Sequence, residues 1–312
     1  MDEIAMGSAI WIRDTEVISS CGEQAGWYLN GQLSVNVDSL GIGEAKRALL
    51  LEPDGSLVVP VGVVRAGEQE FTLYVPVGTS NQVLARLERF RLRTKVTFAR
   101  SSGSVVSFSH DPESGSGYIL RILNSRVPEL VFTDSAVVGV VSLGECYTGL
   151  GSAEVGDLLS DVEFFDRTMI SRILAGEALW RSEIFQGMNP TELGESFTRA
   201  RADFTKGCYT GQELIERVDS RGYKTPRRLS NFLIYGFASD PARLVDRVFK
   251  EDGKAVFTVT SAEAYPPGES VIALGFVHRI GGEFRSQLLG EDGSVHAVGL
   301  GEIPRVLLHR EP

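Results

Sequence analysis

Cysteine is scarce in this chain of 312 residues, which has three, Cys21, Cys146 and Cys208. An odd number at such wide spacing forms neither a disulfide framework nor a Cys-x-x-Cys metal pair. The four histidines are equally scattered, so no ligand spacing typical of a zinc or iron–sulfur site is present. We therefore expect no resident metal, and any cysteine chemistry to be that of a solitary thiol in a reducing compartment.

An excess of positive charge and long apolar runs are also missing. Lys and Arg number 31 against 41 Asp and Glu, which gives a formal net charge of −10. This balance argues against non-specific attraction to nucleic acid or to anionic membranes. No apolar run reaches the roughly 20 residues of a membrane span, and acids stand near the start where a secretory signal carries Lys or Arg. We expect a cytoplasmic protein without direct contact with nucleic acid or membrane.

Strand-like and helix-like patterns alternate over the first hundred residues, which indicates mixed α and β structure. A turn is predicted at 53–55, a helix over 81–93 and a strand over 94–98. The helix is expected to bury one apolar face and to carry its arginines on the opposite face. The residues assigned to the apolar face are Val83, Leu84, Leu87, Phe90 and Leu92.

The remaining chain divides into a helical part and a strand-rich part. The Ser- and Gly-rich segments 101–117 and 144–157 are predicted to be exposed loops, and 161–217 to be mostly helical, with one helix ending near Gly176. Short strand-like segments then recur about every ten residues, which is typical of a small antiparallel sheet or barrel. These segments are 229–237, 254–262, 270–280, 295–300 and 304–309. We place a boundary at 225/226, between an α+β domain of two subdomains, 1–225, and a β-barrel domain, 226–312.

The densest local pattern is FTKGCYTGQELIER at 204–217. Thr210 and Glu213 have the spacing of a capping box, and an amphipathic helix is predicted directly after them. Cys208 then lies just ahead of a helix N-terminus, with Lys206 two residues upstream, and both features favour a thiolate. Gly207 and Gly211 allow a ligand to approach the backbone closely. The alternative is an inert cysteine buried in a capped turn.

A basic island follows at 217–228 in this otherwise acidic chain. It contains five cations and the single acid Asp219. The cations are Arg217, Arg221, Lys224, Arg227 and Arg228. Arginine side chains suit carboxylate or phosphate groups, so the island is either a site for an anionic ligand or a solvated loop.

KGCYTGQE at 206–213 resembles the signature of the YgfZ family of folate-binding proteins, which are relatives of the glycine-cleavage T protein. Further stretches resemble the same family: YLNGQLSVNVDSL at 28–40, LLLEPDGSLV at 49–58, FRLRTKV at 90–96, RILAG to NPTE at 172–192, and Arg221-Gly222. The resemblance thus covers most of residues 25–225.

The resemblance implies an α+β fold of three subdomains, arranged as a ring around a channel that holds tetrahydrofolate, with a C-terminal β-barrel. It also implies an accessory role in the assembly or repair of iron–sulfur clusters, including those of tRNA-modifying enzymes. The expected partners are folate and, transiently, iron–sulfur client or assembly proteins. Cys208 and Lys206 are the expected reactive pair. The expected folate contacts are Gly207, Tyr209, Gly211, Gln212, Glu213, Arg217 and Arg221, with a capping role as the alternative for Glu213.

Two positions depart from the pattern of the aminomethyltransferase relatives. Pro60 stands where those enzymes have an Asp tied to catalysis, and Leu174 stands where their RLEAG motif has a pterin-binding Glu. We therefore expect an accessory protein rather than an enzyme. The alternatives are a folate-dependent aminomethyl transferase of the T-protein type and a binding module that has lost folate.

Overall fold

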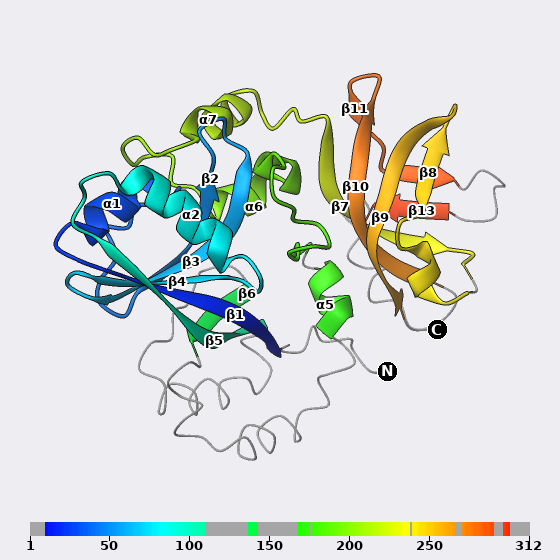
Figure 1. Ribbon diagram of the computed structural model, residues 1–312. Coiled ribbons are helices and arrows are strands. Elements are labelled where there is room, and N and C mark those ends of the chain that lie inside the picture. Colours follow the sequence, from blue (N-terminus) through cyan, green and yellow to red (C-terminus); the bar gives the residue numbers. More distant parts are fainter. Residues whose placement is uncertain are drawn as a thin grey trace, which may run out of the picture.

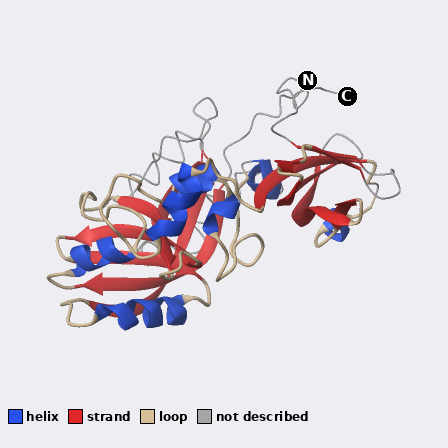
Figure 2. Cartoon of the chain, turned by 90° about the horizontal axis from the view of Figure 1, so that it is seen from above, coloured by secondary structure: helices blue, strands red, loops and turns tan. Residues whose placement is uncertain are grey.

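The computed structural model describes residues 10–109, 137–142, 168–174, 176–237, 239–265, 270–289 and 296–299. These residues form mixed α and β structure, as predicted. Two antiparallel sheets flank a mostly irregular segment with short helices (Figures 1 and 2). The predicted loops at 110–117 and 144–157 and the predicted strand at 304–309 lie outside the described residues.

The first sheet has six strands in the order β2-β3-β4-β1-β5-β6. The strands are β1 (Ile10–Cys21), β2 (Ala45–Leu51), β3 (Leu57–Gly67), β4 (Glu70–Pro76), β5 (Thr97–Ser109) and β6 (Val137–Ser142). Helices α1 (Ala25–Gln32) and α2 (Ser80–Arg91) pack on one face of this sheet (Figure 1). The first part of the segment 28–40, which resembles the YgfZ family, thus belongs to helix α1, and its remainder at 33–40 consists of turns and extended chain.

Strand β2 is buried on both faces, and this double burial positions the candidate site. Successive side chains of a strand point to opposite faces. Ala48 and Leu50 accordingly join the core under α1 and α2, whereas Leu49 and Leu51 join a second core on the other face. This second core also contains residues from 178–215, so the chain that carries the 204–217 pattern packs directly on the sheet.

Three sequence predictions in this half need correction. Leu92 is 88% exposed and has a φ of 47°, because the helix ends at Arg91 and Leu92 is its C-cap. Arg86, expected on the solvent face, is 3% exposed. Residues 101–109 form no loop but extend β5, which pairs with β1 and β6 and begins at Thr97, not at residue 94.

The segment 168–220 is helical only in parts. Its helices are α5 (Thr168–Leu174), η3 (Pro190–Leu193), α6 (Glu195–Arg199) and α7 (Gln212–Ser220). Helix α5 ends two residues before Gly176, as predicted, and Gly176 has a φ of 65°. The intervening stretches 176–189 and 200–211 consist of turns and extended chain, so the expected helical pattern was overestimated there.

The second sheet has seven strands, of which six follow the order β12-β13-β7-β10-β9-β8 while β11 pairs with β10. Its elements are β7 (Arg227–Tyr235), η4 (Pro241–Leu244), β8 (Val248–Glu251), β9 (Lys254–Tyr265), β10 (Ser270–Ile280), β11 (Glu283–Phe284), β12 (Gln287–Leu289) and β13 (His296–Gly299). The described strands form a curled half-barrel around Phe232, Phe249 and Phe257 (Figure 1). The sheet begins at Arg227, next to the boundary placed at 225/226, and the division into domains stays a prediction.

Candidate functional site

The 204–217 pattern forms a loop followed by helix α7, but the predicted capping box is wrong. The N-cap of α7 is Gly211, which has no side chain to cap with. The Thr210 hydroxyl instead donates to the carbonyl of Gly31 in α1, at 3.4 Å. Gln212 Oε1 accepts a hydrogen bond from the backbone N–H of Tyr209 at 3.1 Å. A contact with α1 thus replaces the local contact that the sequence predicts.

The two glycines of the pattern have different surroundings. Gly211 is buried with a φ of 83°, and a Cβ built there would lie 2.6 Å from the carbonyl oxygen of Glu52. Gly207 is exposed, and a Cβ built there meets no atom within 4 Å. Glycine is therefore required at 211, where the start of α7 meets the β2–β3 turn, and is optional for packing at 207.

Lys206 is half-buried, and its ammonium group binds the end of α1. Nζ donates to the carbonyl oxygens of Asn30, Leu33 and Val35 at 2.5, 2.8 and 2.9 Å. Burial lowers the pKa of Lys206 to about 8, against the opposing attraction of Asp203 and Asp38. Since an ammonium has three donors, the three carbonyls account for all of them.

The buried ring of Tyr209 anchors the loop in the second core. Its side chain is buried in the second core together with Leu49, Leu51 and Ile215, and burial raises its pKa above the ordinary value. The ammonium of Lys206 lies 5.0 Å from the centre of its ring. The ring thus packs against the sheet.

Cys208 is an exposed free thiol between these fixed neighbours. We call residues 206–210 the signature arch, because Lys206 and Thr210 at its two ends both bind α1 while Cys208 at its centre faces solvent. The alternative of a cysteine buried in a capped turn is therefore wrong, while the reactivity of the exposed thiol stays a prediction. Cys21, the other free cysteine of the described residues, is partly buried, and burial raises its pKa.

The remaining predicted folate contacts lie on α7 or at its end. Gln212 Nε2 donates to Glu216 Oε1, so both polar atoms of the Gln212 amide have partners within the protein. The side chains of Glu213, Arg217 and Arg221 are exposed. Tyr209 and Gly211 are buried in contacts with the protein itself, and folate contact by the predicted set of residues stays a prediction.

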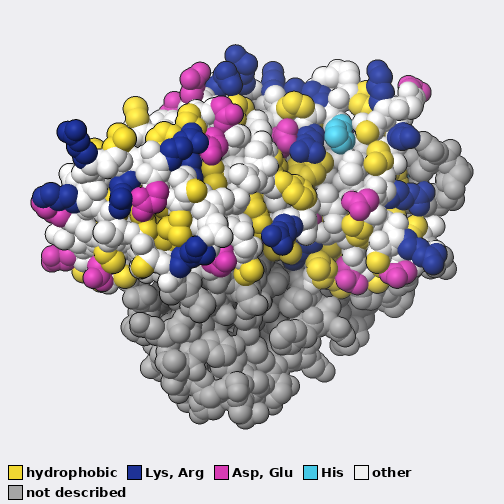
Figure 3. Space-filling model, in the orientation of Figure 1, with side chains coloured by type: hydrophobic (Ala, Val, Ile, Leu, Met, Phe, Trp, Pro, Cys, Tyr) yellow, Lys and Arg dark blue, Asp and Glu magenta, His cyan; other side chains and the backbone are white. Residues whose placement is uncertain are grey.

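The basic island divides into paired and exposed cations. Arg227 pairs with Glu192 at 2.9 Å and stacks on Phe276. Arg228 stacks on Phe284. Arg217, Arg221 and Lys224 are exposed. Basic side chains gather along the upper edge of the face shown in Figure 3, over α7 and the neighbouring strands.

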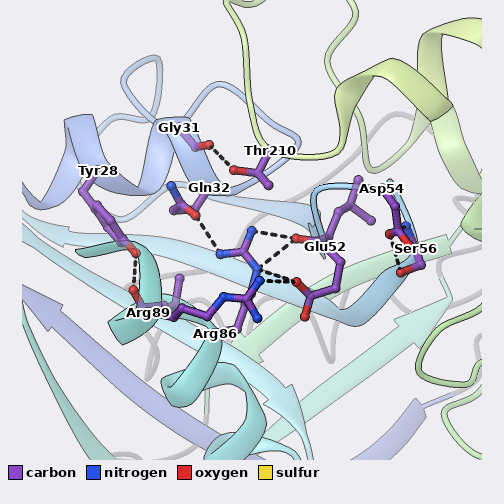
Figure 4. Close-up of polar contacts among 11 residues, drawn as sticks. Tyr28, Gly31, Gln32, Glu52, Asp54, Ser56, Arg86, Arg89 and Thr210 are labelled. Atoms are coloured by element: carbon purple, nitrogen blue, oxygen red, sulfur yellow. Dashed lines mark hydrogen bonds and ion pairs between the residues drawn. The ribbon is translucent and has the colours of Figure 1, made fainter. Parts of the chain in front are cut away.

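Arg86, which the helical pattern assigned to the solvent face, organises the base of the site (Figure 4). Its guanidinium donates to the carbonyl of Leu51 at 2.8 Å and to Gln32 Oε1 at 3.0 Å, and it lies 3.4 Å from a carboxylate oxygen of Glu52. Burial lowers the pKa of Arg86, and Glu52 opposes this shift. In the sequence, Arg86 lies between Val83 and Leu87, which are buried, and one helical turn before Phe90. This spacing could have predicted that Arg86 faces the core.

A second buried ion pair, between Arg172 and Glu183, was not predicted from the sequence. Glu183 is 0% exposed, and it accepts hydrogen bonds from Arg172 at 3.0 Å and from Ser261 at 2.6 Å. It also accepts from the Thr260 hydroxyl and from the N–H of Leu179. The carboxylate therefore joins α5 to β9 of the second sheet. Nothing in the RILAG motif itself indicates this partner eleven residues away.

Other kinds of site are not evident in the part of the chain that the structure describes. No cluster of three or more His, Cys, Asp and Glu side chains there could hold a metal ion. No helix among the described residues has the length and apolar character to span a membrane. A depression of about 610 Å³ is lined by Cys21, Gly22, Glu23 and residues 91–97, and none of the site residues predicted from the sequence lines it.

Comparison with known proteins gives relatives but no family assignment. No protein-family model matches the chain. An iron-sulfur cluster assembly factor IBA57 homolog, mitochondrial, of Neurospora crassa is 25% identical over 285 residues, which cover 82% of this chain and 61% of the relative. Its counterpart in Pyricularia oryzae is 40% identical over 103 residues, 33% of this chain and 24% of the relative. The chain thus spans about three fifths or less of the length of these curated relatives.

Among solved structures, the crystal structure of glycine cleavage system aminomethyltransferase T from Bartonella henselae has the same fold. It superposes with a TM-score of 0.63 at 17% identity, over 94% of this chain and 85% of that one. The predicted aminomethyltransferase-like α+β fold is therefore confirmed. Membership of the YgfZ family stays a prediction.

Proposed function

We propose that this protein is an accessory factor in the assembly or repair of iron–sulfur clusters, with the Cys208 thiol as its working group. The names of both curated relatives support the first part of the proposal. One observation carries the second: Cys208 is exposed at the centre of the signature arch, while Lys206, Tyr209 and Gly211 around it are bound or buried by the protein.

This geometry suits a thiol that meets a partner protein. A thiolate is both a nucleophile and a ligand for iron. One cysteine supplies a single ligand, so a cluster held at Cys208 needs further ligands from an iron–sulfur client or assembly protein. The N-terminus of α7 lies four residues further along the chain and favours negative charge nearby. Enzymes that modify tRNA are the client class that the YgfZ resemblance adds.

The test is replacement of Cys208 in a strain that lacks its own copy of the protein. Cys208→Ser and Cys208→Ala should abolish rescue of an iron–sulfur enzyme activity, because alanine offers no ligand or nucleophile and a serine hydroxyl, unlike a thiol, stays protonated near neutral pH. Cys21→Ser is the matched control and should rescue fully. Circular dichroism and melting temperature should show that all three variants fold. Full rescue by Cys208→Ala contradicts the proposed role.

Binding of tetrahydrofolate is the second part of the proposal, and the aminomethyltransferase-like fold supports it. Glu213, Arg217 and Arg221 remain the proposed contacts, with the two arginines facing the carboxylates of the glutamate tail. Excess tetrahydrofolate at about 100 times its dissociation constant should raise the free energy of unfolding by roughly 2.7 kcal/mol. The variant Arg217→Gln/Arg221→Gln should show a smaller shift. An unchanged melting temperature in wild type contradicts folate binding and favours a module without folate.

Aminomethyl transfer is the competing function, since the matching fold is that of an aminomethyltransferase. Pro60 argues against it, because this position in β3, opposite Leu49 in β2, offers no carboxylate to orient an amine. Turnover of methylene-tetrahydrofolate with an aminomethyl donor would decide for the transferase. The relatives' names place those proteins in mitochondria, and the cytoplasmic location of this chain stays a proposal.

A further inference from the structure

We infer that Lys206 is a positioning residue, which holds the signature arch on the C-terminal end of α1 so that Cys208 is presented to a partner. This replaces the expectation that Lys206 acts on the thiol through its charge. The inference rests on the proposed function only in taking Cys208 as the working thiol. The contacts between the signature arch and α1, which support the inference, do not depend on that function.

The first contact is made by Lys206 with the end of α1. The last carbonyls of a helix lack partners within the helix and need donors from elsewhere. Asn30 lies in the last turn of α1 and Leu33 is its C-cap, and both carbonyls accept from Lys206 Nζ, as does Val35 just beyond. A cation at this end also complements the helix dipole. The ammonium therefore closes α1 and fixes one end of the arch.

The second contact fixes the other end of the arch on the same helix. The N–H of Thr210 donates to the carbonyl of Gly31 at 3.1 Å, and the Thr210 hydroxyl donates to the same oxygen. Both ends of a five-residue segment thus bind adjacent residues of α1. Tyr209 adds a buried ring, so the backbone on both sides of Cys208 is held in place while its free thiol is exposed.

The environment of the ammonium explains why position matters more here than charge. All three of its donors point at carbonyl oxygens, whose partial negative charges offset the positive charge locally. The ammonium is half-buried, whereas the thiol is in solvent, where charge is screened. Loss of Lys206 therefore removes the contacts that hold this end of the arch on α1.

The test compares Lys206→Met, which removes charge and donors, with Lys206→Gln, which removes the charge but keeps two donors. Lys224→Met is the matched control, because Lys224 is an exposed cation of the same region. Hydrogen exchange at the amides of Tyr209 and Thr210 should accelerate about tenfold or more in Lys206→Met, less in Lys206→Gln, and not in the control. Iron–sulfur client activity should fall in the same order when it is measured at a temperature at which all the variants are folded.

Alkylation of Cys208, followed by mass spectrometry at that residue, separates position from charge. The midpoint of its pH profile should be the same in wild type, Lys206→Met and Lys206→Gln, while the plateau rate rises as the arch loosens. Equal midpoint shifts in both variants with unchanged exchange would establish the charge mechanism and overturn the inference. If Lys206→Met does not fold, Lys206→Gln carries the test with the same two readouts.

These measurements also separate the inference from the proposed function. Neither exchange nor alkylation requires a client protein. Rescue by Cys208→Ala together with faster exchange in Lys206→Met would remove the proposed function and leave the positioning role intact. Loss of rescue in Cys208→Ala with unchanged exchange in Lys206→Met would keep the function and remove the positioning role.

Discussion

At the scale of single residues, the two glycines beside Cys208 give a matched pair of predictions. Gly211→Ala should lower the free energy of unfolding by about 2 kcal/mol or more, because its φ of 83° and the backbone oxygen 2.6 Å from the new Cβ both oppose a side chain. Gly207→Ala should change it by less than about 0.5 kcal/mol. Urea denaturation of both variants checks this. Equal losses would mean that the start of α7 does not pack against the β2–β3 turn as described.

Lys206 makes stability depend on pH in a defined direction. Burial lowers its pKa in the folded state to about 8 from the ordinary 10.5, so between these values the unfolded chain binds more protons. The contribution of this group to the free energy of unfolding therefore rises with pH across that window and is absent below it. The stability difference between wild type and Lys206→Met should grow from pH 7.5 to about pH 9.5 in urea denaturation. A difference that shrinks over this range would mean that the ammonium is not desolvated.

The residue-scale outcome shows which roles a local pattern can predict. The motif at 204–217 marked Cys208, and the structure exposes that thiol. The roles of Lys206 and Thr210 could not be read from their own segment, because their partners lie about 170 to 180 residues earlier in α1. Contacts of this range leave no spacing signal in a single sequence.

At the scale of elements, the link between α5 and β9 depends on Glu183. Glu183→Ala should cost about 3–5 kcal/mol, because it leaves the buried guanidinium of Arg172 without its carboxylate. Glu195→Ala is the control, since the Glu195–Arg199 pair is exposed, and it should cost less than about 1 kcal/mol. Chemical denaturation measures both. A loss in Glu183→Ala as small as in the control would show that the second sheet does not depend on this carboxylate.

Most elements could be predicted where hydrophobic periodicity is strong. The errors occur where tertiary contacts override the local preference of the sequence. Strands β7, β9, β10 and β13 of the second sheet follow predicted segments, because β9 alternates between buried and less buried positions and β10 is a continuous buried apolar run. The β5 segment at 101–109 was missed because Ser and Gly are poor strand signals, yet pairing with β1 and β6 stabilises it. The capping box failed for the same kind of reason, since α1 competes for Thr210.

At the scale of the whole molecule, the sequence indicated an α+β part and a strand-rich part but not the core that the two parts share. Phe276 of β10 packs with Leu49, Leu51 and Tyr209 in the second core. The Arg227–Glu192 pair and Glu183 add polar links between the same parts. Sequence composition, on which the boundary at 225/226 is based, does not reveal these contacts, because each joins residues that are separated by tens to hundreds of positions.

This shared core predicts how the chain unfolds. All three tryptophans lie before residue 226, so their fluorescence reports the first part, while hydrogen exchange at β9 and β10 reports the second. In wild type the two probes should give one coincident transition, because removing the second sheet exposes the core beneath the signature arch. In Phe276→Ala the transitions should separate, whereas Phe249→Ala, whose ring lies in the second sheet's own core, should lower stability there without exposing the arch. Two separate transitions in wild type would mean that 1–225 and 226–312 unfold as independent units. The stability of the site around Cys208 would then not depend on the second sheet.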